Sequence, residues 1–240
     1  MDQAGAAWRT EEARADPLFA PIFAVPAAPD GCIVIGRLAQ TLDGRIATRA
    51  GHSQWIGGEA DLVHTHRLRA LCHAVVVGAG TIRADDPQLT TRRVEGPSPV
   101  RVVLDAGRGL GTEHRVFRDG LPTLLVTARD GAASHGGAEV VEVAADADGL
   151  DLPGLLRALA ARGLTRIFVE GGGQTVSRFL AAGCLDRLHV TVAPMILGSG
   201  RPAFDLKEVT RIGEGLRFGW TCHPLDPDVL FDIALDRRAP

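Results

Sequence analysis

The sequence has few of the features that mark a metal-binding or disulfide-stabilised protein. Its four cysteines are far apart, with no Cys-x-x-Cys pair and no histidine at zinc-ligand spacing beside them: Cys32, Cys72, Cys184 and Cys222. A zinc site or a disulfide framework needs closely or regularly spaced cysteines. We therefore expect no bound metal, and buried thiols in a reducing compartment.

The sequence also lacks a strong excess of either charge. Its formal net charge is −3, so no broad basic face for a nucleic acid is expected. Residues 1–16 mix arginine and glutamate among alanines, and no apolar run there is long enough for a signal-peptide core or a membrane span. These features favour a cytoplasmic protein that binds a small molecule, and neither nucleic acid nor membrane.

Residues 1–30 differ from the rest of the chain in their proline content. Prolines at positions 17, 21, 26 and 29 remove backbone donors and disfavour helix. We therefore expect a proline-rich arm over residues 1–30, extended from residue 16 to residue 30, followed by a single domain over residues 31–240. The arm has apolar side chains that suggest packing across a partner subunit, namely Leu18, Phe19, Ile22 and Phe23.

From Cys32 onward, apolar runs of strand length alternate with helix-patterned stretches. The expected strands cover residues 32–38, 74–77, 100–104, 123–126, 139–143 and 166–169. The expected helices cover residues 59–71, 152–162 and a stretch that follows the glycines at 171–173 and ends near Gly183. This alternation predicts an α/β fold around a largely parallel, buried sheet. Two more strands, over 188–196 and 229–235, predict antiparallel edges.

The strongest local motif is a buried strand that runs through Glu170 into three glycines and then into an amphipathic helix. Backbone N–H groups at a helix N-terminus favour an anion such as a pyrophosphate. A tight structural turn is the alternative. Glu170 ends the strand where open α/β sheets place a ligand, but it could instead accept hydrogen bonds from the free amides of the helix.

Two other constellations carry side chains suited to ligand contact. Ser53 and Trp55 lie in an expected loop, where an indole face suits a cofactor, although a core position is the alternative for the tryptophan. Arg69 near a helix end and Arg92 after a strand could converge on one phosphate, or could simply be solvated. His64 and His66 are two apart on one helix and face different ways, which argues against a shared metal.

Taken together, these motifs resemble the reductase domain of the bifunctional riboflavin-biosynthesis deaminase-reductase, a relative of dihydrofolate reductase. The resemblance extends from about Cys32 to Phe204. It is carried, in family order, by Leu42-Asp43-Gly44-Arg45, Ser53-Gln54-Trp55-Ile56, His66-Arg67-Leu68-Arg69, Gly78-Ala79-Gly80-Thr81, Asp85-Asp86-Pro87-Gln88-Leu89-Thr90, Val169-Glu170-Gly171-Gly172-Gly173 and Ala193-Pro194-Met195-Ile196-Leu197-Gly198. It implies a dihydrofolate reductase-like three-layer fold, with a central twisted mixed sheet flanked by helices, and a homodimer.

The resemblance also implies NADPH as the cofactor and a phosphorylated aminopyrimidine as the substrate. Its implied nucleotide contacts are Ala39, Trp55, Thr81, Asp85, Gly172, Gly173, Gln174, Thr175, Val176 and Ser177. Its implied substrate contacts are Arg37, Ser53, Arg69, Leu89, Arg92 and Glu170, of which Arg69 and Arg92 form a pair for the 5-phosphate. Asp85 is the expected catalytic side chain, orienting the substrate or stabilising an iminium.

The implied reaction transfers a hydride to C1 of the ribosyl group in its open, imine-like form and leaves a ribitylamino product. Such a step requires orientation and exclusion of water rather than a nucleophile, so no catalytic triad is expected. Alternatives within this chemistry are a reductase of the same fold that acts on another pterin or pyrimidine, and, from a different class, a catalytically silent nucleotide-binding protein.

The chain departs from the family pattern at two points. Arg37 stands where the family often has lysine, and its forked guanidinium could change which ring substituents fit. The deaminated and the 2,5-diamino pyrimidines therefore both remain candidate substrates. The His-x-Glu and Pro-Cys-x-x-Cys signature of the zinc deaminase domain is absent from this sequence, so a separate deaminase is expected in the pathway.

Overall fold

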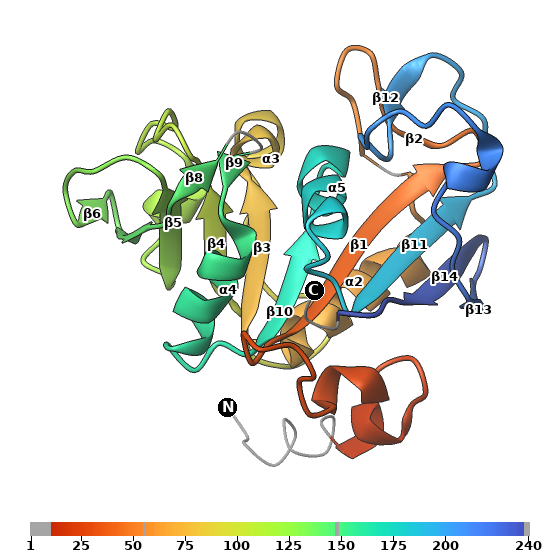
Figure 1. Cartoon of the computed structure of the whole chain (residues 1–240), viewed down its shortest axis with the longest axis horizontal. Coiled ribbons are helices and arrows are strands. Elements are labelled where there is room, and N and C mark those ends of the chain that lie inside the picture. Colours follow the sequence, from red (N-terminus) through yellow and green to blue (C-terminus); the bar gives the residue numbers. More distant parts are fainter. Residues whose placement is uncertain (1–10, 55, 147–148, 238–240) are drawn as a thin grey trace.

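The computed structural model describes residues 11–54, 56–146 and 149–237. Within them, long-range strand pairing builds a ten-stranded sheet in the order β13-β14-β11-β1-β10-β3-β4-β5-β7-β6. The strands are β1 (Ile33–Thr41), β3 (Ala74–Gly78), β4 (Val100–Leu104), β5 (Thr123–Thr127), β6 (Ser134–His135), β7 (Ala138–Glu142), β10 (Arg166–Glu170), β11 (Arg187–Ala193), β13 (Trp220–Leu225) and β14 (Asp228–Ala234). Figure 1 shows this sheet crossing the molecule.

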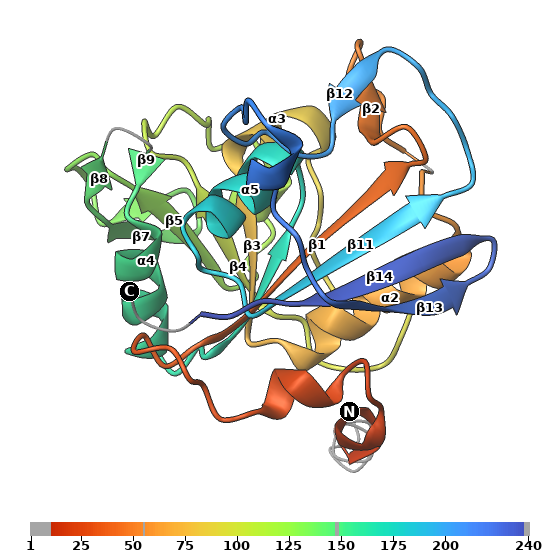
Figure 2. The same cartoon turned by 45° about the vertical axis from the view of Figure 1, so that its right-hand side comes forward.

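The strands from β11 to β7 in this order pair in parallel, whereas β14, β13 and β6 add antiparallel pairs at the edges. The expected mixed sheet with antiparallel C-terminal strands is therefore confirmed. Two short antiparallel pairs lie outside this sheet: β2 (Arg45–Thr48) with β12 (Gly200–Pro202), and β8 (Ala145–Asp146) with β9 (Gly149–Leu150). The β2–β12 pair extends beyond the carboxyl ends of β1 and β11 (Figure 2).

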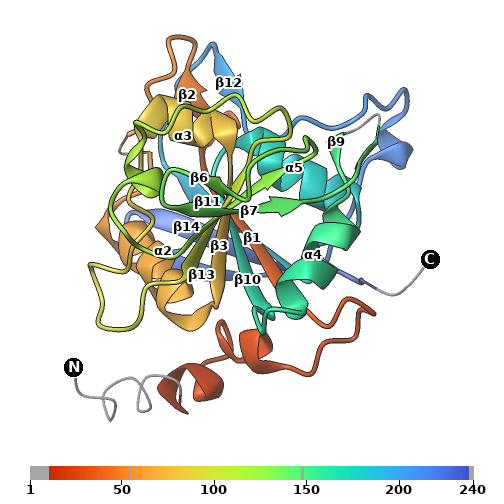
Figure 3. The same cartoon turned by 90° about the vertical axis from the view of Figure 1, so that its left-hand side faces the viewer.

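Helices cover both faces of the sheet, as the view along its edge shows (Figure 3). The helical elements are η1 (Ala20–Phe23), α2 (Glu59–Leu71), α3 (Ala79–Asp85), η2 (Arg115–Phe117), α4 (Leu152–Ala160), α5 (Gly173–Ala181) and η3 (Ile212–Glu214). α2 packs on one face, and α4 and α5 pack on the other. The three helices expected from the sequence are confirmed, and α3 is an additional short helix that directly follows β3.

Alternation of side chains along the central strands divides the interior into two hydrophobic cores. Val34 and Val76 belong to the core under α4 and α5, whereas Ile33 and Val75 belong to the core under α2. Because both faces are covered, the central strands are apolar at almost every position, which is why their sequences read as continuous apolar runs. Burying a side chain of this size stabilises the fold by about 1.5–3 kcal/mol.

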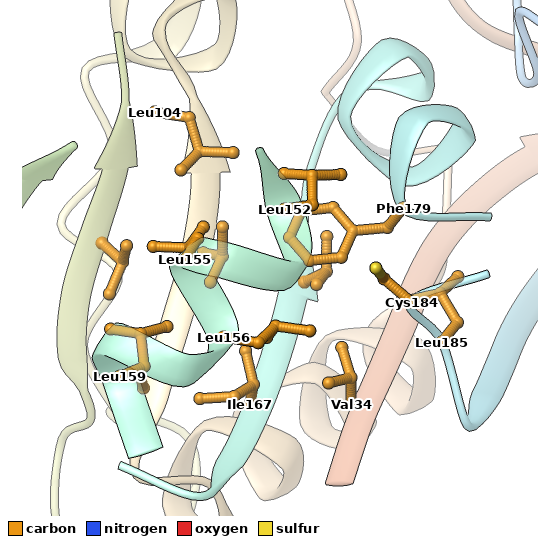
Figure 4. Close-up of a cluster of buried hydrophobic side chains, with 14 of the residues drawn as sticks. Val34, Leu104, Leu152, Leu155, Leu156, Leu159, Ile167, Phe179, Cys184 and Leu185 are labelled. Atoms are coloured by element: carbon orange, nitrogen blue, oxygen red, sulfur yellow. The ribbon is translucent and has the colours of Figure 1, made fainter. Parts of the chain in front are cut away.

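Helix α4 shows how local sequence directs this packing. The Asp151 carboxylate accepts a hydrogen bond from the Gly154 N–H at 3.0 Å and so caps the helix. The leucines of α4 then follow helical spacing and pack against the sheet beneath (Figure 4). These side chains are almost completely buried: Leu152, Leu155, Leu156 and Leu159. They contribute to the same core as Phe179 of α5.

The amino-terminal segment differs from its prediction. Residues 20–23 form η1, so the expectation of an extended stretch over residues 16–30 is wrong at that point, and residues 11–15 before it are helical. Proline fits the first turn of a helix, where its missing N–H would be unpaired in any case, and Pro21 occupies that position in η1. Leu18, Phe19 and Ile22 are buried in the core under α2 of the same chain, which removes the reason for placing them against a partner subunit.

The cysteines follow the expectation with one exception. Cys32, Cys72 and Cys184 are buried, and burial is the main cause that raises the pKa of the first two thiols to about 12 and of the third to about 11. Cys222 on β13 is exposed, so the expectation of a buried thiol is wrong there. Across the described ranges, no helix is long and apolar enough to cross a bilayer, and no cluster of three potential metal ligands occurs.

Candidate active site

A cleft of about 1230 Å³ opens toward the carboxyl ends of neighbouring parallel strands. Ala39 of β1, Gly78 of β3, Leu104 of β4 and Glu170 of β10 all line it. Ligands of open α/β sheets bind at this edge, and the cleft is larger than the roughly 300–1,000 Å³ typical for one drug-sized molecule. It has room for two ligands side by side.

Most of the side chains singled out from the sequence line this one cleft. They are Arg37, Ala39, Ser53, Arg69, Thr81, Asp85, Leu89, Arg92, Glu170, Gly172, Gly173, Gln174 and Thr175. Val176 and Ser177 do not line it: both are buried, the valine in the hydrophobic core and the serine with its Oγ accepting the Asp205 N–H at 2.8 Å. Helical periodicity turns these two residues inward. Trp55 lies outside the described residues.

The first turn of α5 follows β10 through a backbone that requires glycine. Gly171 has a φ of +124°, which side-chain-bearing residues rarely adopt. A Cβ at Gly173 would overlap the backbone carbonyl of Ala203. The Gly172 N–H donates to Thr81 Oγ1 at 3.4 Å and the Thr175 N–H to the Gly172 carbonyl at 3.0 Å. The N-cap Gly172 supplies no side-chain cap, so the amides of Gly173 and Gln174 remain available for an anion. The turn is thus both a tight connection and a site suited to a phosphate group.

Beside this turn, Arg69 of α2 and Glu170 of β10 form a bidentate ion pair. Arg69 Nε donates to Glu170 Oε2 at 2.8 Å and Nη2 donates to Oε1 at 2.5 Å. Burial opposes ionisation of the carboxyl, but the guanidinium outweighs it and holds the pKa of Glu170 below its usual value. Glu170 is therefore an ionised acceptor fixed by Arg69. From the sequence, Glu170 was expected either to contact a ligand or to accept hydrogen bonds from the free amides of the helix, and neither role includes the pair with Arg69.

Arg92 reaches the same region from the loop after α3. Its Nη1 donates to Gln88 Oε1 at 2.7 Å and to Thr90 Oγ1 at 2.9 Å, while Arg69 Nη1 donates to the Thr90 carbonyl at 2.9 Å. Burial, followed by the nearby charges of Arg69 and Arg93, lowers the pKa of Arg92. The two guanidinium groups therefore both contact Thr90.

Arg37 of β1, the in-register neighbour of Glu170 on β10, pairs with Asp61 of α2. Asp61 also accepts a hydrogen bond from Thr191 Oγ1 of β11 at 2.6 Å and is almost completely buried. The sequence gives no signal for Asp61, because an acid in the first turn of a helix is ordinary. Its position means that Arg37 is held at a defined point of the cleft wall.

Asp85 lies at the end of α3 and lines the cleft opposite the β2–β12 pair. Partial burial raises the pKa of its carboxyl, and the charge of Arg201 on β12 partly opposes this shift. Arg201 and Arg178 also line the cleft, and neither was singled out from the sequence.

Comparison with known proteins gives matches along most of the chain. The model of the RibD C-terminal domain matches residues 33–222. The 2,5-diamino-6-ribosylamino-4(3H)-pyrimidinone 5′-phosphate reductase of Methanothermobacter thermautotrophicus is 40% identical over 191 residues, which cover 76% of this chain and 85% of the relative.

Longer relatives match over one part of their length. Riboflavin biosynthesis protein RibD of Mycobacterium tuberculosis is 35% identical over 205 residues, which cover 83% of this chain and 53% of the relative. The solved structure of Acinetobacter baumannii RibD superposes with a TM-score of 0.76 at 26% identity, covering 87% of this chain and 59% of that one. The chain thus spans little more than half the length of these two proteins.

Proposed function

The chain belongs to the RibD C-terminal domain family and has its dihydrofolate reductase-like fold, and on that premise we propose that it is an NADPH-dependent reductase of riboflavin biosynthesis. Its reaction converts the ribosyl group of a 5-phosphoribosylaminopyrimidine to ribityl. The observation that carries this proposal is the convergence of Arg69, Arg92 and Glu170 with the open N-terminus of α5 in one cleft. That arrangement offers separate sites for a phosphorylated substrate and a dinucleotide.

The residues of the cleft fit a nicotinamide dinucleotide. The uncapped amides of Gly173 and Gln174 suit its pyrophosphate, with Thr81 and Ala39 on the walls beside them. When bound, the reduced nicotinamide supplies the hydride. Arg178 and Arg201 are cleft cations separate from the Arg69–Arg92 pair, so they are candidates for the additional phosphate that distinguishes NADPH from NADH. The contact expected for Trp55 stays a prediction.

The substrate contacts follow from the charges. Arg69 and Arg92 suit the 5-phosphate, and Arg92 retains Nε and Nη2 as donors because both of its bonds use Nη1. Glu170 remains an acceptor for ribosyl hydroxyls, since each carboxylate oxygen has a lone pair beyond the one that Arg69 uses. Arg37, fixed by Asp61, is placed to contact the pyrimidine ring.

The protein assists reduction at C1 by orientation and by proton supply. Ring opening transfers a proton to the ring oxygen as the C1–O bond breaks and the C1–N imine forms, and hydride addition at C1 then requires a proton at the nitrogen. We assign supply of that proton to Asp85, a carboxyl of the cleft whose pKa is raised by burial. The ion-paired walls hold the sugar in one orientation while the ligands displace water. We propose Asp85 as the catalytic side chain on these grounds.

The 2,5-diamino pyrimidine is the favoured substrate. The relative from M. thermautotrophicus, 85% of whose length is covered, is named for that compound. A separate deaminase would then act on the reduced product.

We also propose a cytoplasmic homodimer. Several apolar side chains in the C-terminal third of the chain are more than half exposed, which suits an interface with a second copy: Ile196, Ile212, Leu216 and Trp220.

The test follows the near-ultraviolet absorbance of NADPH with the purified protein and either pyrimidine phosphate. Oxidation with either compound supports the reductase, and the faster one identifies the pathway step. Protein that binds NADPH but oxidises it with neither compound would remove the riboflavin assignment and favour the silent nucleotide-binding alternative. A parallel titration with NADPH and NADH measures the cofactor preference directly.

A further inference from the structure

His66 contacts the loop that carries Arg92. The imidazole lies on α2, is only 4% exposed, and precedes Arg69 by three residues, so both side chains lie on the same face of the helix. The Arg92 N–H donates to His66 Nδ1 at 2.9 Å, and the Arg93 N–H lies 3.5 Å from the same atom. Nδ1 must therefore be the unprotonated nitrogen of a neutral ring.

Burial and the neighbouring positive charges keep the His66 ring neutral. Burial, followed by the cations Arg69 and Arg92, lowers the pKa of His66 to about 4, although Glu170 opposes the shift. The ring is therefore an acceptor over the whole physiological pH range. A protonated ring would turn a donor toward the two N–H groups and add a cation to a region that already holds three arginines.

The same loop is held by α2 at a second point. Arg69 Nη1 donates to the Thr90 carbonyl at 2.9 Å, two residues before the bond that His66 accepts. Upstream, Leu89 is buried in the core with a φ of +57°. Residues 89–92 form no helix or strand, so side-chain contacts hold their backbone: those from α2, and the bonds of Thr91 with Ser98 Oγ and the Pro97 carbonyl. The bond to His66 is the one made by the Arg92 N–H itself.

We propose that His66 is a positioning residue that holds the Arg92 backbone through Nδ1. The loop is then already in the conformation in which the Arg92 guanidinium binds the substrate phosphate. This inference rests on the proposed function, because it assigns Arg92 to the phosphate. Fixing a loop in its binding conformation improves affinity by reducing the entropy lost on binding. In this role the imidazole, which also lines the cleft, acts through the Arg92 backbone and not as a phosphate ligand.

Three variants separate this role from a purely structural one. His66→Leu removes the acceptor, His66→Gln moves it toward the position of Nε2, and His66→Asn keeps an oxygen near the position of Nδ1. We expect His66→Leu and His66→Gln to raise KM for the phosphorylated pyrimidine by about tenfold with kcat nearly unchanged, because the Arg92 N–H loses its acceptor in both variants. His66→Asn should stay close to the wild type.

A double-mutant cycle tests the route through Arg92. If His66 acts by placing that guanidinium, His66→Leu should cost little more in KM when Arg92 is already alanine. Additive losses would overturn the proposal. Equal performance of His66→Asn and His66→Leu, or equal losses with phosphorylated and unphosphorylated pyrimidine, would overturn it as well. His66→Gln supplies the same comparison if the leucine variant does not fold.

Binding of ribose 5-phosphate, measured by calorimetry against ribose, separates this proposal from the proposed function. Wild-type protein that binds ribose 5-phosphate but reduces neither pyrimidine would contradict the reductase assignment alone. His66→Leu should then still bind ribose 5-phosphate about tenfold more weakly. An unchanged dissociation constant for ribose 5-phosphate in this variant, or no binding by the wild type, contradicts the role of His66.

Discussion

The two regions of the cleft that suit phosphate groups are built in different ways. At the N-terminus of α5 the donors belong to the backbone, and the structural requirement is small residues such as Gly171 and Gly173. Around Thr90 the donors belong to side chains, and the requirement is the Arg69–Glu170 ion pair together with the contacts of Arg69 and Arg92 with Thr90. The first region is therefore sensitive to added volume, and the second to removed charge.

The largest expected effect comes from breaking the side-chain region at its buried pair. Arg69→Met leaves Glu170 ionisable and unpartnered, although the two side chains are only 8% and 16% exposed. We expect the free energy of unfolding in urea to fall by about 3–5 kcal/mol. Glu59→Gln, which breaks the exposed pair with Arg93, should cost less than about 1 kcal/mol. Similar losses of stability in both variants would contradict the view that the buried Arg69–Glu170 pair stabilises this region.

The next effect removes charge without breaking that pair. Arg92→Ala takes away the partly exposed guanidinium, and KM for the phosphorylated pyrimidine should rise about 10- to 100-fold, because a hydrogen bond to a charged group contributes about 1.5–3 kcal/mol. The matched control is Arg67→Ala, which removes an exposed arginine of α2 and should leave KM as it is. An unphosphorylated substrate should not distinguish Arg92→Ala from the wild type.

The backbone region is tested by adding a single methyl group. Gly173→Ala places a Cβ against the Ala203 carbonyl, so the first turn of α5 must shift. We expect the dissociation constant for NADPH to rise about tenfold, measured by calorimetry, while binding of ribose 5-phosphate changes little. Gly213→Ala is the control, since a Cβ there meets nothing within 4 Å. Equal NADPH affinity in the two variants would refute a phosphate site at α5.

The smallest effect concerns a buried polar group outside both regions. His64 Nε2 lies 3.1 Å from His189 Nδ1, and His189 Nε2 lies 3.3 Å from Asp232 Oδ1. Burial lowers the pKa of both imidazoles, and in His189 it outweighs the opposing effect of Asp232.

The folded state therefore resists protonation at pH values where the unfolded histidines, with pKa near 6.5, already bind protons. Stability should be full above about pH 6.5 and should fall as the pH decreases below it, seen as a lower Tm. His64→Gln should flatten this dependence, whereas His52→Gln, at an exposed position, should not. A Tm independent of pH in the wild type would count against the buried pair.

The sequence pattern predicted the strands and helices whose apolar residues recur at regular spacing. The central strands are buried on both faces and α4 has a regular apolar stripe, so their periodicity is visible locally. Helix α3 was missed because it has seven residues and includes Gly80, which gives it too little periodicity to detect. The amino-terminal segment was misread because proline disfavours the interior of a helix but not its first turn.

The sequence indicated those parts of the site that depend on a short local motif. Three successive glycines after a strand indicate a backbone site, and the family motifs indicated Glu170 and the pair of Arg69 and Arg92. The bond between Arg69 and Glu170 joins residues 101 apart in the chain, and no local pattern encodes such a contact. Asp61 and His66 were likewise missed as contributors, because their roles depend on partners brought together only by the fold.

The distribution of thiols has a practical consequence. Three cysteines are buried and hold their protons at neutral pH, because their pKa values are raised to about 11 or 12, whereas Cys222 is exposed on β13 at the end of the strand order. A maleimide dye should therefore attach at one position in the native protein. Labelling that slows as protein concentration rises would show that a second copy covers this edge of the sheet, and a constant rate would show that the edge stays open to solvent.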